Sequence, residues 1–380
     1  MKNIALFKPL FRKEEILEEI SICLDKGWTG IGFKTDEFEK KWCEYTHLKN
    51  CHFINSATSG LHLAIKVFKD ELGWLEGDEI ITPPITFVST NHSVLYESLV
   101  PIFSDIDSSL CLDPVQLEKN ITNKTRAIIY VGIGGNASNF KEIHKICKQN
   151  NLILILDAAH MAGTKWLNNN LHIGQEADCT VFSYQAVKNC PTSDSGSICF
   201  KDNELDKKVR ILSWLGISDN TFNRANSKNN TYKWNYDVDQ LGFKYNGNSI
   251  AAAMAIISLR YLDDDNKIRR QISQKYISAF SSNELINPII HDKEIISSRH
   301  LLQVVVHNRE GFLNHMASHG ISCGVHYKAN NKFSIYEKYN HNNLSYSDSI
   351  DNKIVSLPLH LYLSDEDVNF VINTANHYKP

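Results

Sequence analysis

The sequence predicts an α/β fold in which a mostly parallel central sheet is flanked by helices. Three observations lead to this prediction. Between residues 51 and 156, short apolar runs alternate with helical stretches, an order typical of strands in one sheet with helices on its faces. The run at 152–156 is apolar at every position, as expected of a strand buried on both faces. With 380 residues, the chain also exceeds the size at which a single core stops growing, so we expect two lobes.

The expected elements follow in chain order. A helix at 14–26 has its apolar residues on one stripe, and the glycine-containing segment 27–32 ends it. A second helix runs through Phe38 and Trp42. Strands and helices are then expected in turn at 52–54 and 61–68, 79–81 and 88–96, 127–131 and 140–149, followed by strands at 152–156 and 179–182.

The C-terminal part is expected to form a smaller α+β lobe. A polar, asparagine-rich loop at 220–237 precedes a helix at 250–262. A strand at 301–307, a helix around Phe312 and a last helix at 365–377 follow. We therefore divide the chain into a large domain at 1–248 and a small C-terminal domain at 249–380.

Composition favours a soluble enzyme with a small-molecule partner. The 40 basic and 43 acidic residues give a net charge of -3, without the positive field that nucleic-acid or membrane-surface binders need. No run approaches the roughly 20 apolar residues of a membrane span, and the N-terminus lacks the apolar core of a signal peptide. The nine cysteines form no C-x-x-C pair and the 16 histidines no H-E-x-x-H motif. We therefore expect no metal site, no disulfide framework and a cytoplasmic location.

Polar side chains follow two of the expected strands, at the sheet edge where ligands bind in such folds. Asp157 and His160 come after the strand at 152–156, and Ser183 and Lys188 after the strand at 179–182. Taken singly, these residues have plain alternatives: a helix cap, a structural histidine and a solvated surface lysine. Taken together, they supply what pyridoxal phosphate needs, an amine for its aldehyde and an acid for its pyridine nitrogen.

Two further segments complete such a site. At 57–60, the run Ala-Thr-Ser-Gly ends a strand and begins a helix, whose free N–H groups and positive dipole end favour phosphate. Phe87 is expected to stack on the cofactor ring, and the alternative is an aromatic side chain of the core.

The order of these segments resembles the DegT/DnrJ/StrS family of sugar aminotransferases, which has the aspartate-aminotransferase fold, fold type I. The resemblance covers nearly the whole chain, and the number and order of its segments carry it. These segments are 30–39, Asn55-Ser56-Ala57-Thr58-Ser59-Gly60, 77–87, Asp157-Ala158-Ala159-His160, 182–189, Gly242-Phe243-Lys244-Tyr245-Asn246, Val325-His326-Tyr327 and Leu357-Pro358-Leu359.

The resemblance implies a pyridoxal 5'-phosphate-dependent aminotransferase with Lys188 as its catalytic, Schiff-base lysine. Asp157 is then implied to meet the pyridine nitrogen, and His160 the ring hydroxyl. Three hydroxyl groups are implied to bind the phosphate: those of Thr58, Ser59 and Ser183. The two half-reactions would give ping-pong kinetics.

The resemblance also implies the partners. It implies a homodimer with shared active sites, in which Lys244 of the neighbouring subunit reaches the phosphate; a surface charge is the alternative. The implied acceptor is a nucleotide-linked keto-sugar, foremost a 4-keto-6-deoxysugar, with L-glutamate as donor, in amino-sugar and surface polysaccharide biosynthesis. A 3-keto isomer and a keto-acid sugar stay open, because Gln185 replaces a histidine frequent in the family. The residues expected to contact substrate are Trp234, His326 and Tyr327.

One alternative comes from another class, an NAD-dependent sugar oxidoreductase or dehydratase. The segment 132–137, Gly-Ile-Gly-Gly-Asn-Ala, follows an expected strand and precedes a helix, and Asp157 ends the next strand about 20 residues on. This arrangement matches a dinucleotide-binding fingerprint, but it leaves Ser183, Lys188 and Thr58 without a role. A non-catalytic ligand-binding protein is disfavoured because it needs neither Lys188 nor Asp157. The aminotransferase is therefore the favoured interpretation.

Overall fold

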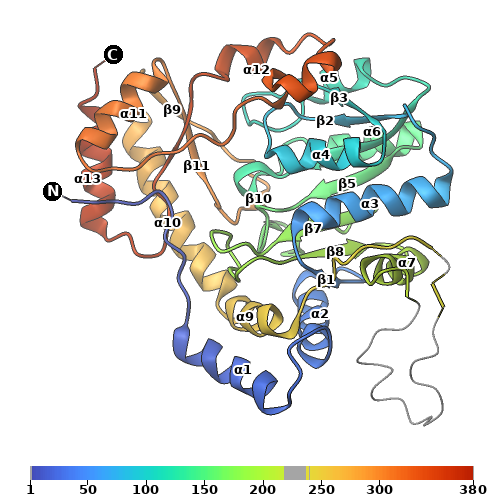
Figure 1. Cartoon of the computed structure of the whole chain (residues 1–380). Helices are drawn as coiled ribbons and strands as arrows, with labels where there is room; N and C mark the ends of the chain where they lie inside the picture. The colour runs from blue at the N-terminus through green and yellow to red at the C-terminus, as the bar shows by residue number, and fades with distance from the viewer. Residues whose placement is uncertain (1, 218–236, 239, 380) are drawn as a thin grey trace.

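A seven-stranded sheet forms the centre of the computed structural model, which describes residues 2–217, 237–238 and 240–379 (Figure 1). The strand order is β1-β8-β7-β5-β4-β2-β3, and the five strands from β7 to β3 are mutually parallel. Strand β8 runs antiparallel to both of its neighbours, β1 and β7. The strands are β1 (His52–Ile54), β2 (Glu79–Thr82), β3 (Val100–Phe103), β4 (Thr125–Val131), β5 (Ile153–Asp157), β7 (Cys179–Ser183) and β8 (Gly196–Phe200). The predicted α/β class with a mostly parallel sheet is confirmed.

Helices cover both faces of this sheet. Successive strand residues alternate between two apolar cores: Ile128 and Leu154 face one side, Ile129 and Ile155 the other. Helices α3 (Ala57–Leu72), α4 (Val88–Tyr96) and α7 (Asn203–Ser213) pack on the second face. The first face is covered by α2 (Phe33–Thr46), α5 (Pro114–Lys119), α6 (Phe140–Asn150) and α9 (Ser249–Arg260). The N-terminal helix α1 (Lys13–Asp25) packs against α9.

A smaller lobe follows along the long helix α10 (Leu262–Phe280), which leads away from α9 (Figure 1). Its antiparallel sheet has the order β12-β11-β9. The elements of this lobe are β9 (Ile286–Pro288), β11 (Leu302–Val306), β12 (Ile354–Leu357), α11 (Arg309–Ser318) and α13 (Asp365–Asn376). The short helix α12 (Ser345–Ile350) instead packs against the core of the large sheet, beside α5 (Figure 1). A two-stranded ribbon of β6 (Lys165–Trp166) and β10 (Ile295–Ile296) links the lobes. Helix α9 packs in the core of the large sheet, although the predicted boundary assigns it to the small domain. The division between residues 248 and 249 stays a prediction.

Every strand and helix expected up to residue 182 is present, but the sequence did not indicate several others. Strand β3 contains Pro101, which argues against a strand except at a sheet edge, where β3 lies. Helix α10 is polar over most of its length, above all in its first half, so no apolar run in the sequence marks it. Most of the loop expected at 220–237 lies outside the described residues.

Within the described ranges, no helix combines the length and apolar character needed to cross a membrane. In the same part of the chain, no group of three or more His, Cys, Asp or Glu side chains is arranged to hold a metal ion.

Candidate active site

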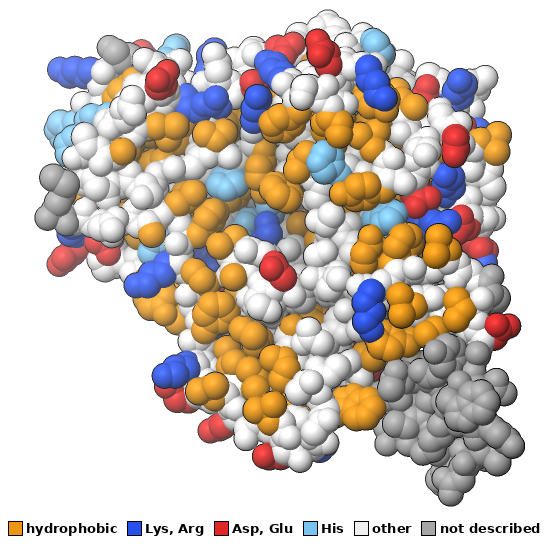
Figure 2. Space-filling view, viewed as in Figure 1, with side chains coloured by type: hydrophobic (Ala, Val, Ile, Leu, Met, Phe, Trp, Pro, Cys, Tyr) orange, Lys and Arg blue, Asp and Glu red, His pale blue; other side chains and the backbone are white. Residues whose placement is uncertain are grey.

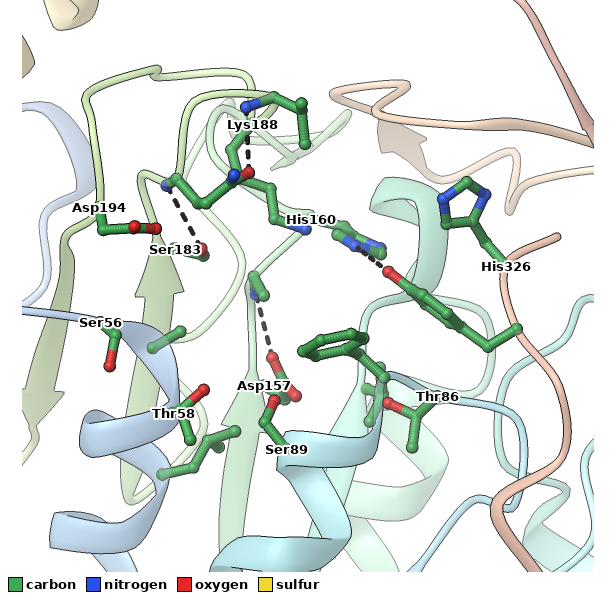
Figure 3. A pocket seen from close by; sticks show the side chains of 18 of the residues that line it. Ser56, Thr58, Thr86, Ser89, Asp157, His160, Ser183, Lys188, Asp194 and His326 are labelled. Carbon is green, nitrogen blue, oxygen red and sulfur yellow. Dashed lines mark hydrogen bonds between the residues drawn. The ribbon is translucent and has the colours of Figure 1, made fainter. Parts of the chain in front are cut away.

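A cavity of about 440 Å³ lies at the carboxyl ends of β5 and β7, beside the first turns of α3 and α4. Figure 2 shows a hollow near the middle of this face, with basic and histidine side chains inside it, and Figure 3 shows the cavity from close by. Its polar lining consists of Ser56, Thr58, Thr86, Ser89, Asp157, His160, Ser183, Gln185, Lys188, Asp194, Ser195, His326 and Tyr327. The polar residues predicted after separate strands therefore meet in one place, as the carboxyl ends of parallel strands must.

Lys188 lies in the turn between β7 and β8, and its side chain lines the cavity (Figure 3). The turn is held from inside, because the N–H of Lys188 donates to the carbonyl of Gln185 at 2.8 Å. It is also held from outside, because the amide of Asn189 donates to the carbonyl of Ser298 at 2.8 Å. Burial lowers the pKa of Lys188 to about 8, against the opposing charge of Asp157. A substantial part of the amine is therefore neutral near pH 7.5, as a nucleophilic lysine requires.

Asp157 is the buried acid of the cavity. One carboxylate oxygen accepts from the hydroxyl of Thr90 at 2.8 Å, and the other accepts from the N–H of Ala159 at 3.1 Å. Burial raises the pKa of Asp157, while these two hydrogen bonds and Lys188 lower it. No helix begins at Asp157, so the plain alternative of a helix cap does not apply. A fixed, buried carboxylate of this kind suits a cationic nitrogen.

His160 is held as a neutral imidazole. Its Nδ1 accepts from the N–H of Gly134 at 3.1 Å, so in the neutral ring the proton is on Nε2. Nε2 then donates to the hydroxyl of Tyr327, 3.1 Å away (Figure 3). Burial lowers the pKa of His160 well below its usual range, with a smaller effect from the charge of Lys188. The hydroxyl group of Tyr327 accepts this bond and can therefore donate its own proton to another group.

The first turn of α3 forms the end of the cavity that suits a phosphate group. Ser56 caps the helix by accepting from the N–H of Ser59 at 3.1 Å, and the side chains of Ser56, Thr58 and Ser183 line the cavity. The N–H groups of the two residues after the cap have no partner within the helix, and the helix dipole adds positive charge there. Gly196 of β8 lies against this turn, where a Cβ would come within 2.8 Å of a backbone nitrogen. Only glycine permits this approach.

These groups fit pyridoxal phosphate. An amine with a lowered pKa, a buried carboxylate and a set of hydroxyl and N–H donors at a helix N-terminus surround one cavity. They match the aldehyde, the pyridine nitrogen and the phosphate of that cofactor.

Several predicted residues lie elsewhere or have other contacts. Ser59 does not line the cavity: its hydroxyl donates to the carbonyl of Ser56 at 2.7 Å and serves the helix cap. Phe87 does line it, but the residue is 55% exposed and its ring centre lies 5.7 Å from that of Tyr327. His326 lines the cavity while its Nδ1 bonds to the hydroxyl of Ser356 at 2.8 Å.

Two predicted residues are not placed at the cavity. Lys244 is exposed, and its ammonium nitrogen lies 3.1 Å from the ring centre of Trp214 in the same chain. The predicted role of Lys244 is a contact with the phosphate in a neighbouring subunit, and a single chain does not test it. Trp234 lies outside the described residues.

Three residues at or beside the cavity were not predicted from the sequence: Ser56, Thr90 and Asp194. A serine before a helix is a capping signal, so the sequence pattern could have indicated Ser56. Thr90 supports Asp157 from α4, 67 positions away in the chain, and no local pattern indicates such a contact. Asp194 is exposed at the edge of the cavity in an irregular segment, which has no periodicity to interpret.

The glycine segment at 132–137 is buried throughout. A Cβ on Gly132 would overlap the sulfur of Met161. The carbonyl of Gly135 accepts from the hydroxyl of Ser297 at 2.9 Å, and the N–H of Gly134 is taken by His160. The segment is packed against protein on all these sides, so it does not form the open loop that a dinucleotide needs.

Comparison with known proteins identifies the family of the chain. The model of the DegT/DnrJ/EryC1/StrS aminotransferase family matches residues 11–376. The spore coat polysaccharide biosynthesis protein SpsC of Bacillus subtilis is 32% identical over 97% of this chain and 95% of that protein. The UDP-4-amino-4,6-dideoxy-N-acetyl-beta-L-altrosamine transaminase of Campylobacter jejuni is 30% identical over 90% of this chain and 89% of its own length.

Solved structures agree. PseC of Helicobacter pylori, an aminotransferase involved in the biosynthesis of pseudoaminic acid, superimposes with a TM-score of 0.89 at 26% identity, covering 98% of each chain. The PLP form of Spr1654 from Streptococcus pneumoniae gives a TM-score of 0.88 at 28% identity, covering 99% of this chain and 98% of that one. The chain therefore belongs to the DegT/DnrJ/EryC1/StrS aminotransferase family and is a pyridoxal-phosphate-dependent sugar aminotransferase.

Proposed function

We propose that this enzyme moves the amino group of L-glutamate to the keto carbon of a nucleotide-linked 4-keto-6-deoxysugar. The observation that carries the proposal is the pairing in one cavity of Lys188, with its lowered pKa, and the buried carboxylate of Asp157. Each has a required role in transamination, and neither is needed for binding alone.

Lys188 performs the proton transfers of both half-reactions. With a pKa of about 8, its Nζ is neutral often enough to act as nucleophile and base, and protonated often enough to return the proton. The turn that holds Lys188 is fixed at both ends, so the same nitrogen serves the donor and the acceptor at one position. The amino group stays on the enzyme after the keto-acid product of the donor has left and before the acceptor binds, which gives ping-pong kinetics.

The carboxylate of Asp157 stabilises a positive charge on the group that lies opposite it. Pyridoxal phosphate, when bound, supplies an electron sink for the carbon that loses its proton. A carboxylate held by Thr90 and the N–H of Ala159 stabilises the protonated pyridine nitrogen on which that sink depends. We assign the phosphate to the first turn of α3 with Thr58 and Ser183, and the ring face to Phe87.

The substrate proposal is supported by the relatives. The Campylobacter jejuni relative is named for a UDP-linked sugar that carries its amino group at C-4 and is deoxygenated at C-6. The Bacillus subtilis relative is named for polysaccharide biosynthesis. On this basis we propose C-4 amination of a nucleotide sugar that feeds a surface polysaccharide, with His326 and Tyr327 contacting the substrate.

We also propose a cytoplasmic homodimer. In it, Lys244 of the neighbouring subunit would reach the phosphate. The exposure of Lys244 supports this role, because its ammonium group has only the Trp214 ring beside it and no carboxylate partner in the described part of the chain.

The test is a screen with nitrogen-labelled L-glutamate. The purified enzyme with added pyridoxal phosphate is incubated with 4-keto-6-deoxy, 3-keto and keto-acid nucleotide sugars, and products are identified by mass. We expect labelled nitrogen in the 4-keto product alone, none with Lys188→Ala, and full activity with Lys201→Ala, which removes an exposed lysine. Labelling of only a 3-keto or keto-acid sugar would overturn the substrate proposal, and an unlabelled amino-sugar would overturn glutamate as donor.

A further inference from the structure

Asn189, the residue after Lys188, is buried and connects the Lys188 turn to two distant parts of the chain. Its Nδ2 donates to Oδ1 of Asn266 in α10 at 2.6 Å and to the carbonyl of Ser298 at 2.8 Å. Its Oδ1 lies 2.8 Å from Nδ1 of His300. All three partners are buried as well. One amide group therefore joins the Lys188 turn to α10 and to the segment 297–300.

The partners fix the orientation of the Asn189 amide. Nδ2 of Asn266 donates to the carbonyl of Ala162 at 2.9 Å, so Oδ1 of Asn266 is the atom that accepts from Asn189. The reversed Asn189 amide would place its oxygen against two acceptors. Oδ1 of Asn189 therefore faces His300, whose Nδ1 must carry the proton. Burial lowers the pKa of His300 well below its usual range, so this ring is neutral.

The same segment also supports the loop that carries His160. The hydroxyl of Ser298 donates to the carbonyl of His160 at 2.7 Å, and the N–H of His300 donates to the carbonyl of Gly134 at 3.0 Å. The N–H of Gly134 donates in turn to His160. The ring centres of His300 and His160 lie 4.4 Å apart. The two loops that face the cofactor therefore share one support.

We propose that Asn189 is a positioning residue for Lys188. It holds the base of the lysine side chain against the segment 297–300 and α10, and thereby sets the position of Nζ relative to the loop of His160. Lysine has a flexible four-carbon stem, so its amine meets a fixed aldehyde reliably only when the main chain beneath it is fixed. A misplacement of about 1 Å can cost about 100-fold in rate. The inference rests on the assignment of Lys188 to the cofactor, which is part of the proposed function, and not on the identity of the sugar.

The test compares the affinity of the apoenzyme for two forms of the cofactor. Pyridoxal phosphate has an aldehyde that bonds to Lys188, whereas pyridoxamine phosphate has an amine in its place and forms no such bond. The Kd of pyridoxal phosphate divided by the Kd of pyridoxamine phosphate therefore reports how well Lys188 is placed. We expect Asn189→Ala to raise this ratio by about tenfold or more, with little change in the Kd of pyridoxamine phosphate.

A second variant changes the network from its other end. His300→Phe keeps a flat ring beside Phe7, on which the His300 ring stacks, but donates nothing to Asn189. It should raise the same ratio, and it provides the test if the loss of three hydrogen bonds in Asn189→Ala prevents folding.

Two reference variants calibrate the ratio. Lys188→Ala should raise it most, because it removes the bond altogether. Asn50→Ala is the matched control and should leave it unchanged. The amide of Asn50 also donates to one backbone carbonyl and one asparagine oxygen, those of Phe200 and Asn203, but Asn50 does not line the cavity.

The outcomes separate a positioning role from a structural one. If the two Kd values change by the same factor in Asn189→Ala and His300→Phe, the network serves the fold alone and the proposal is overturned. An unchanged ratio in Lys188→Ala would instead overturn the assignment of Lys188 to the cofactor, and the role of Asn189 with it.

Discussion

Lys188 should capture pyridoxal phosphate with a pH dependence set by its own burial. Only the neutral amine attacks the aldehyde. With a pKa of about 8, the neutral fraction is about 9% at pH 7, about 50% at pH 8 and about 91% at pH 9. The capture rate should therefore rise about fivefold from pH 7 to 8 and less than twofold from pH 8 to 9. The phosphate ester titrates near pH 6, roughly, and does not interfere.

The assay is stopped-flow absorbance of apoenzyme mixed with pyridoxal phosphate at each pH. Asp157→Asn removes the charge that raises the pKa of Lys188, so the plateau should be reached at lower pH. Asp194→Asn is the matched control: Asp194 is exposed at the edge of the cavity and is not among the groups that shift the pKa of Lys188. A rate that rises tenfold at both steps is the behaviour of an ordinary lysine, and it would refute the reasoning.

Three further predictions follow from particular contacts. Gly196→Ala should weaken cofactor binding at least tenfold in a fluorescence titration, because its Cβ would collide with the first turn of α3, whereas Gly30→Ala, with open space around it, should bind normally. Glu39→Ala should lower the free energy of unfolding in urea by about 2–4 kcal/mol, because it removes the acceptor shared by buried His52, the backbone N–H of Phe53 and Arg210, which keeps Asp206; a loss below about 1 kcal/mol would contradict this network. Thr90→Val removes a hydrogen bond that lowers the pKa of Asp157, so the cofactor Kd should increase more between pH 8 and pH 6 than in the unmodified enzyme; an equal increase would show that this bond does not control the carboxylate.

The arrangement of the site was largely predictable because it follows from strand order. Alternating strand and helix segments give parallel strands, whose carboxyl ends share one edge. Asp157 and Ser183 end two such strands, Lys188 follows the second of them, and Thr58 lies at the start of the helix after another strand. Sequence alone could therefore predict that they meet in one cavity.

Contacts between distant segments could not be predicted. The pairing of His160 with Gly134 and Tyr327 depends on how three segments pack. The glycines at 132–135 match a dinucleotide fingerprint locally, yet side chains from the C-terminal part, such as Ser297, pack against them. Ser59 illustrates the opposite error: its hydroxyl lies near the predicted phosphate site but is used by its own helix cap.

The central claim, that Lys188 is the residue bonded to the cofactor, is tested most directly by trapping that bond. The holoenzyme is reduced with borohydride, digested, and its peptides are analysed by mass spectrometry. We expect a pyridoxyl-phosphate adduct on the peptide that contains Lys188, and none after prior treatment with L-glutamate. An adduct on another lysine, or no adduct from a protein that binds the cofactor, would contradict it.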